Sequence, residues 1–269
     1  GVITAATLKL VPQPKARETA MVAARSLPDA LWLLGRLQAE TDGAVEAFEY
    51  MDRTFMRTHA ARYPDAPRPF TAEHDVNILL ELATTSDRDA TEDSTGRTPL
   101  ARRLEAVLEA AWEEGRVLDA VLARSDAQRA AFWQRRESAA EITVARKPVL
   151  ITDIALPVDA VATFLDAMRP RLETIDPGAE PMAIAHLGDG NIHYSVWPTD
   201  AARIDAIVEA VEDEVARLRG SFSAEHGIGT SKRASMARRK DPVALSVMRA
   251  IKAALDPDGL LNPGKVLPD

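Results

Sequence analysis

The chain of 269 residues contains no cysteine, so disulfides, thiolate metal sites and cysteine nucleophiles are excluded. Basic residues are outnumbered, 33 against 41 acidic residues, and the net charge of −8 argues against nucleic acid as the main partner. No apolar run approaches the length of a membrane span, and no secretory signal is visible. From these absences we expect a cytoplasmic protein with no membrane span.

The length allows one or two domains with a substantial core, and apolar periodicity predicts strands and helices in alternation. The expected strands cover 4–11, 18–24, 45–51, 76–84, 150–156, 182–186, 192–197 and 221–224. The expected helices cover 26–40, 52–60, 100–115, 126–143, 159–172, 201–219, 231–240 and 243–255. This pattern predicts the α+β class, with a mostly antiparallel sheet that is covered by helices on one face.

Three of the five histidines lie in two short segments, 185–194 and 223–229. In the first segment, Asp189 and Gly190 stand between apolar flanks, which is typical of a two-residue hairpin loop. Such a loop would pair His186 with His193 on one face of the ladder, with Cβ atoms about 4.5–5.5 Å apart. The glycines at 188 and 190 also favour close approach of a ligand to the backbone.

Two imidazoles at that separation can both reach one divalent ion, and Glu225 in the second segment is the obvious donor of a carboxylate. Two histidines and one carboxylate leave coordination positions open, as catalytic metal sites do. The same residues also have plainer interpretations. The hairpin could be a polar turn without a metal, and residues 225–229 could form a surface loop with helix-capping glycines. Spacing alone leaves both interpretations open.

Three motifs stand in order along the chain: His-Leu-Gly-Asp-Gly-Asn-Ile-His at 186–193, Ala-Glu-His-Gly-Ile-Gly at 224–229 and Leu-Asp-Pro-Asp-Gly-Leu-Leu-Asn-Pro-Gly-Lys at 255–265. Together they resemble the C-terminal portion of FAD-linked oxidases. That family includes D-lactate dehydrogenases, D-2-hydroxyglutarate dehydrogenases and the glycolate oxidase flavoprotein subunit. The resemblance extends over essentially the whole chain, and it implies a cap-like substrate domain of ferredoxin-like character.

The resemblance further implies three parts. Residues 1–14 match the tail of a FAD-binding domain that is missing here, 15–219 the substrate domain, and 220–269 a helical segment that returns to the FAD domain. FAD is then bound mostly by the missing part, and the isolated chain is expected to be inactive. Asn262 matches a family asparagine that faces the flavin, although Asn-Pro-Gly by itself indicates only a turn that ends a helix.

By the same resemblance, the metal-ligand positions of the family match His186, His193 and Glu225, with zinc or manganese as the expected ion. A divalent ion would lower the pKa of a substrate hydroxyl, and flavin would take the hydride from the adjacent carbon. The family's proposed base matches His226. A neutral imidazole suits that role, since its pKa is close to the working pH.

The segment 132–137 resembles the family's Trp-x-x-Arg-Glu, so Arg136 is expected to bind the substrate carboxylate through two parallel hydrogen bonds. A solvated helix face explains the same arginine equally well. Asn191 and Ser195 are the other expected substrate contacts.

Three departures from hydroxyglutarate-type members concern substrate choice. Those members have Lys where this chain has Ile151, Asn where it has Ser195, and Thr where it has Ala140. Loss of such polar contacts weakens the binding of a second carboxylate. We therefore expect a smaller or more apolar 2-hydroxy acid to be preferred over hydroxyglutarate.

The leading prediction is thus the substrate- and metal-binding part of a FAD-dependent D-2-hydroxy acid dehydrogenase. One alternative is a metal-dependent hydrolase, in which the same ion activates water. Another is a non-catalytic metal-binding module that pairs with a flavin subunit through an apolar surface. The expected partners are a small 2-hydroxy acid and a FAD-binding domain or subunit. The electron acceptor and a homodimer are left open.

Overall fold

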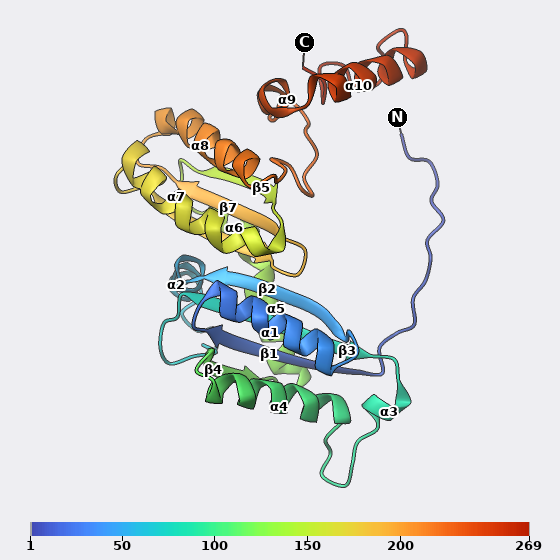
Figure 1. Cartoon of the computed structure of the whole chain (residues 1–269), viewed down its shortest axis with the longest axis vertical. Coiled ribbons are helices and arrows are strands. Elements are labelled where there is room, and N and C mark those ends of the chain that lie inside the picture. The colour runs from blue at the N-terminus through green and yellow to red at the C-terminus, as the bar shows by residue number, and fades with distance from the viewer. Residues whose placement is uncertain (1, 269) are drawn as a thin grey trace.

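The computed structural model describes residues 2–268 as one seven-stranded sheet with helices packed on it (Figure 1). The strands are β1 (Ala16–Ala24), β2 (Val45–Asp52), β3 (Val76–Thr84), β4 (Val117–Leu122), β5 (Leu150–Ala155), β6 (Glu180–His186) and β7 (Asn191–Trp197). The helices are α1 (Leu27–Glu40), α2 (Arg53–Arg62), α3 (Asp87–Ala90), α4 (Pro99–Glu113), α5 (Asp126–Glu137), α6 (Ala139–Val144), α7 (Val161–Ile175), α8 (Ile204–Arg217), α9 (Arg233–Arg239) and α10 (Pro242–Leu255), with short 3₁₀ turns η1 (Val158–Ala160) and η2 (Ala201–Arg203). The predicted α+β class is confirmed.

Several helix starts are fixed by local sequence. Ser26, Thr98 and Ser125 precede α1, α4 and α5, and each side chain accepts a hydrogen bond from a backbone N–H of the first turn. Such caps satisfy donors that the helix itself leaves unpaired. Within residues 2–268, every helix is too short or too polar to traverse a bilayer.

The strand order is β4-β1-β3-β2-β6-β7-β5, and all neighbours are antiparallel. The first four strands, in the order 4-1-3-2 with α1 and α4 as crossovers, form a ferredoxin-like unit. The second half repeats it: β5, α7, β6, β7 and α8 follow the same course, with β7 between β5 and β6. Edge strands β2 and β6 join the halves, where Tyr50 lies opposite Ala185. The ferredoxin-like expectation is therefore met twice.

The fourth strand of the second unit is almost absent. A strand was expected at 221–224, but only Ser221 bridges to Ala155 of β5, so that prediction is wrong. Beyond Ser221 the segment keeps one backbone hydrogen bond to β5, from the Ala224 N–H to the Asp153 carbonyl at 3.1 Å, and it forms the loop that carries Glu225 and His226. Loss of this strand therefore frees the loop for another role at the end of β5.

Helices cover both faces of the sheet rather than one. On the first face, α1, α4, α7 and α8 bury a large core that includes Leu33, Leu104 and Phe164. On the second face, the shorter α2, α5 and α6 cover a smaller cluster around Phe55 and Phe132. The polar side chains described below lie on this second face, beside that cluster.

Both ends of the chain extend away from the sheet (Figure 1). Residues 2–14 belong to no strand, and all of them except the half-buried Pro14 are exposed, so the strand predicted at 4–11 is wrong. The strand that follows this segment, β1, pairs with β3 and β4 on its two edges. At the other end, α10 buries only Leu245. The large apolar side chains that it and the following turn expose are Val243, Val247, Ile251, Leu255, Leu260 and Leu261.

Candidate functional site

The hairpin that carries the two histidines differs from the predicted one. We expected a two-residue loop with His186 opposite His193, and that register is wrong. His186 lies opposite Asn191, and His193 lies opposite Ile184. The loop has four residues, because the N–H groups of Asp189 and Gly190 both donate to the His186 carbonyl, at 3.2 and 3.1 Å.

The change of register moves the pairing by two residues, and side chains alternate with a period of two. Both histidines therefore stay on the same face, with ring centroids 5.4 Å apart. The backbone of Gly190 is approached by the chain itself rather than by a ligand. A Cβ on Gly190 would lie 2.0 Å from the Leu156 carbonyl oxygen, and its φ is +79°. Nothing lies within 4 Å of the corresponding position on Gly188.

The structure brings together all three expected metal ligands. One potential ligand atom from each of His186, His193 and Glu225 lies within 4.8 Å of the other two. His186 Nε2 and Glu225 Oε1 are 3.7 Å apart. The residues come from β6, from β7 and from the loop after Ser221, which are separated by up to 39 positions in the chain but adjacent across the sheet.

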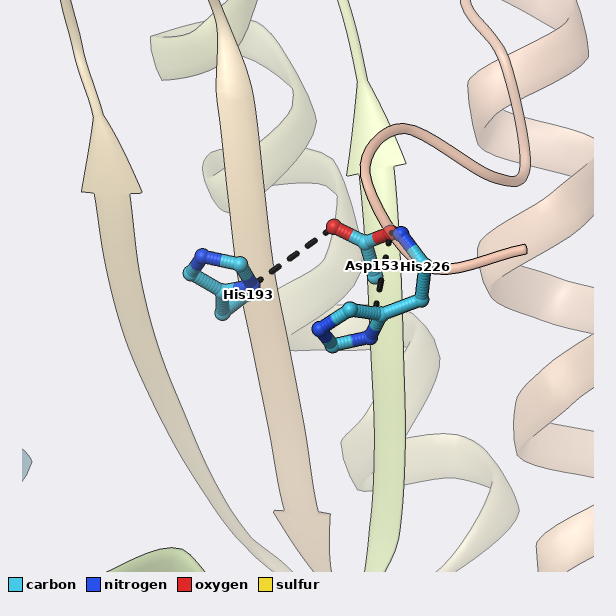
Figure 2. Close-up of side chains that lie close together, drawn as sticks. All are labelled: Asp153, His193 and His226. Carbon is cyan, nitrogen blue, oxygen red and sulfur yellow. Dashed lines mark hydrogen bonds and ion pairs between the residues drawn. The ribbon is translucent and has the colours of Figure 1, made fainter. Parts of the chain in front are cut away.

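A second possible donor set shares His193 and adds Asp153 and His226 (Figure 2). His193 Nδ1 is 3.6 Å from Asp153 Oδ1, and His226 Nδ1 is 3.8 Å from Asp153 Oδ2. The two imidazole rings stack with centroids 5.8 Å apart. Sequence reasoning did not select Asp153 as a site residue. The available signal was its place within the apolar run of β5, where a buried carboxylate needs a partner.

Asp153 fixes the loop that carries Glu225 and His226. It is 1% exposed, and its Oδ2 accepts hydrogen bonds from the N–H groups of Ala224, Glu225 and His226, at 3.2, 2.9 and 2.6 Å. Hydrogen bonds to a carboxylate are about twice as strong as neutral ones. This one side chain therefore aims the backbone of the loop at the two histidines. Its Oδ1 is buried and has no hydrogen-bond partner among residues 2–268.

Glu49 and Arg136 orient His186. Glu49 Oε1 is 2.8 Å from His186 Nδ1, and Arg136 Nε donates to Glu49 Oε2 at 2.8 Å. A carboxylate on one ring nitrogen fixes the tautomer and leaves the other nitrogen free to act as a ligand. Arg136 Nη2 lies 3.4 Å from that other nitrogen, Nε2. Arg136 is thus a buried residue at the site, and the alternative of a solvated helix face is wrong.

Burial and nearby charges together shift the pKa values of the residues in this cluster. The hydrogen bond to Glu49 raises the pKa of His186 against the opposing effect of burial. Burial lowers the pKa of His193, and the nearby charges of Arg136 and His186 lower it further. Burial raises the pKa of Glu49, but the hydrogen bond from His186 and the charge of Arg136 outweigh it, so the net shift is downward. His193 is therefore disposed to be neutral, as a metal ligand must be.

Asn191 and Ser195, the expected substrate contacts, are both buried on β7, on the same face as His193. The amide nitrogen and oxygen of Asn191 have no hydrogen-bond partner within residues 2–268. A buried amide without partners is rare in native proteins, and a water, an ion or a substrate bound beside it is one explanation. Asn262 is exposed in the turn after α10 and is not brought to this cluster.

The donor chemistry fits a divalent ion. His186, His193 and Glu225 supply two imidazoles and a carboxylate, with Glu225 still exposed to solvent. The orphaned Asp153 oxygen and Asn191 amide lie on the same face of the sheet and can take part in binding an ion or its substrate. Such a set suits zinc and manganese alike.

Comparison with known proteins places this geometry in context. A family model described as "FAD linked oxidases, C-terminal domain" matches residues 13–266. The chain is 33% identical over 273 residues to the mitochondrial D-2-hydroxyglutarate dehydrogenase of Rattus norvegicus. This alignment covers 100% of the chain and 48% of the relative. It is 30% identical over 272 residues to the Arabidopsis thaliana mitochondrial enzyme of the same name, covering 100% of the chain and 46% of that relative. The chain thus spans about half the length of the curated relatives that it matches.

Solved structures show the same fold at low sequence identity. A p-cresol methylhydroxylase with bound substrate matches 94% of this chain and 53% of its own, with a TM-score of 0.63 and 13% identity. A 4-ethylphenol oxidase from Gulosibacter chungangensis matches 97% of this chain and 56% of its own, with a TM-score of 0.60 and 14% identity.

Proposed function

The chain belongs to the family of FAD-linked oxidase C-terminal domains, and from this premise we propose that it is the substrate- and metal-binding part of a FAD-dependent D-2-hydroxy acid dehydrogenase. The observation that carries the proposal is the cluster of His186, His193 and Glu225 beside the buried Arg136 and the unpartnered Asn191. An oxidation of this class needs positive charge for a carboxylate, a base for a hydroxyl proton and an acceptor for a hydride.

Each protein group has a proposed task. Arg136 binds the substrate carboxylate, since its guanidinium faces the His186 ring while Glu49 holds its Nε. The Asn191 amide, which has free donors and an acceptor, orients the same substrate. His226, exposed on the loop that Asp153 fixes, takes the hydroxyl proton. A divalent ion held by His186, His193 and Glu225 would supply Lewis-acid stabilisation of the alkoxide, and flavin would accept the hydride.

We further propose that residues 1–14 and 220–269 contact a FAD-binding domain or subunit. The apolar side chains exposed on α10 and the extended residues 2–14 support this, because monomeric soluble proteins rarely expose large contiguous apolar surfaces. Asn262 lies within that C-terminal segment, and we propose that it faces the flavin there. The isolated chain then holds few FAD contacts.

The test of the metal proposal is elemental analysis of the purified chain. We expect about one zinc or manganese per chain after incubation with each ion, and loss of that metal in His193→Ala because one of three ligands is removed. His74→Ala is the matched control and should keep the metal, since His74 lies in neither donor set. An equal metal content in all three proteins would refute the site. Turnover of ester substrates without flavin would instead support the metal-dependent hydrolase.

The second prediction concerns substrate choice. Ile151 is paired with Ser195 across β5 and β7, and Ile151 is 45% exposed, so an apolar side chain and a short hydroxyl stand where hydroxyglutarate-type members have Lys and Asn. We expect the chain, assembled with its FAD-binding part, to prefer a 2-hydroxy acid with one carboxylate over hydroxyglutarate. A panel of kcat/KM values measures this.

A paired substitution sharpens that test. Ile151→Lys with Ser195→Asn should raise kcat/KM for hydroxyglutarate about 10-fold or more, in line with the ~1.5–3 kcal/mol of a hydrogen bond to a charged group. Leu118→Lys, at an equally exposed position on β4, should leave kcat/KM for hydroxyglutarate unchanged. A wild-type preference for hydroxyglutarate would refute the expectation.

A further inference from the structure

Arg135 is a buried cation without an acidic partner. It directly precedes Arg136 on α5, but its side chain lies in different surroundings. It is 4% exposed, and its Nη2 donates to the Pro67 carbonyl. Nη1 is shielded from solvent and has no hydrogen-bond partner among residues 2–268. Within the same part of the chain, no carboxylate forms an ion pair with it. Burial lowers the pKa of Arg135, which shows how unfavourable the charged form is in this place. Buried charges in proteins are normally paired.

Arg135 lines a cavity of about 270 Å³ between α2, the loop 63–75 and α5. We call it the Arg135 cavity. Three further arginines line it, Arg53, Arg57 and Arg68, against a single acid, Glu73. This excess of positive charge is local, since the whole chain carries a net charge of −8.

The cations around the cavity are not equally available. Arg53 pairs with Asp75 at 2.9 Å, and Arg57 pairs with Glu180 at 2.7 Å. Arg68 is exposed at the rim and makes no ion pair within residues 2–268. Arg68 and Arg135 are therefore the two guanidinium groups that a ligand can use.

Two histidines complete the lining, the buried His59 and the half-buried His74. Burial lowers the pKa of His59 to about 4, so its ring is neutral at pH 7 and can donate one N–H. His74 Nε2 is shielded from solvent and has no hydrogen-bond partner among residues 2–268. The cavity thus gathers several donors and few acceptors.

We propose that the Arg135 cavity binds a small oxyanion, a phosphate or a carboxylate group, with Arg135 as its main contact and Arg68 at its rim. A planar guanidinium matches both oxyanions through two parallel hydrogen bonds. The volume lies just below the range of about 300–1,000 Å³ that is typical of pockets for drug-sized ligands, so the ligand is small.

This site is separate from the proposed dehydrogenase site. None of His186, His193, Glu225 or Arg136 lines the cavity. Arg135 and Arg136 are consecutive on α5, so this helix links the two sites. A bound anion would hold α5 from one side while Glu49 holds it from the other.

The test is calorimetric titration of the chain with inorganic phosphate and with acetate, after chelation has removed any metal. We expect saturable binding of at least one anion. Arg135→Gln should raise Kd about 10-fold or more, because hydrogen bonds to charged groups contribute ~1.5–3 kcal/mol each. Arg135→Lys keeps the charge but loses the fork, and should give an intermediate Kd.

Arg68→Glu provides a second variant at an exposed position that leaves folding intact, and it should also weaken binding. Arg36→Ala is the control, since Arg36 is exposed on α1 outside the cavity. His193→Ala should bind the anion as the wild type does, whatever the outcome for the metal site. Tighter binding of phosphate than of acetate would identify a dianion as the ligand. Absence of saturable binding with both anions, or equal Kd values in Arg135→Gln, Arg68→Glu and wild type, would overturn the proposal.

Discussion

Replacing His226 with alanine should lower kcat about 10²–10⁴-fold, the usual contribution of a general base, while the chain keeps its metal. The measurement is steady-state turnover of the chain assembled with its FAD-binding part, beside elemental analysis. The physical reason is that His226 lies next to Glu225 on a loop fixed by Asp153 but is absent from the donor set of His186, His193 and Glu225.

His186→Ala is the matched variant, because each of the two possible donor sets contains one of these histidines and shares His193. If the ion sits with Glu225, His186→Ala loses the metal and His226→Ala keeps it. The opposite pattern would place the ion with Asp153 and would make His226 a ligand rather than a base. Unchanged kcat in His226→Ala would remove it from the mechanism altogether.

Replacing Glu81 with alanine should lower the free energy of unfolding by about 3 kcal/mol, near the lower end of the cost of breaking a buried ion pair. Glu81 is 2% exposed on β3. It accepts two hydrogen bonds from Arg129 at 2.6 and 2.8 Å, one from Trp133 at 3.0 Å and one from Thr19 at 2.7 Å. These bonds fasten α5 to the sheet. The value is at the low end because Arg129 is about one third exposed, so water can solvate it when Glu81 is removed.

Glu46→Ala is the control. Glu46 contacts Arg17, another partner of Glu81, but its side chain is 44% exposed. An exposed ion pair contributes less than about 1 kcal/mol, so this variant should unfold close to the wild type in urea. An equal loss of unfolding free energy in Glu81→Ala and Glu46→Ala would show that the buried network stabilises the fold no more than an exposed ion pair does.

The same network predicts a dependence on pH. Burial raises the pKa of Glu81, but hydrogen bonds from Arg129, Trp133 and Thr19 outweigh it and bring the pKa to about 2. A carboxylate with a lowered pKa stabilises the fold fully above its unfolded value of about 4.5 and loses that effect as pH falls toward 2. The difference in unfolding free energy between wild type and Glu81→Gln should therefore narrow over that interval. A constant difference would contradict the assignment.

Local sequence determined much of this protein. Caps such as Ser26 and Thr98 mark helix starts, and apolar periodicity places most helices and strands because burial of one face is a local pattern. The three motifs at 186–193, 224–229 and 255–265 indicated the family. The first two also predicted that His186, His193 and Glu225 lie in one cluster. The β-strand period of two explains why the wrong hairpin register still put both histidines on one face.

Tertiary structure decided what depends on contacts distant in sequence. The loop length at 187–190 depends on Leu156 and Phe48, whose backbones bond to Gly190 and Leu187 across the sheet. The residues 4–11 have strand-like alternation, but a strand also needs a partner edge, and within residues 2–268 they pair with none. Asp153 is an ordinary acid in the sequence. Only the fold brings its carboxylate under the backbone of residues 224–226, 71 or more positions away, where three N–H groups meet it.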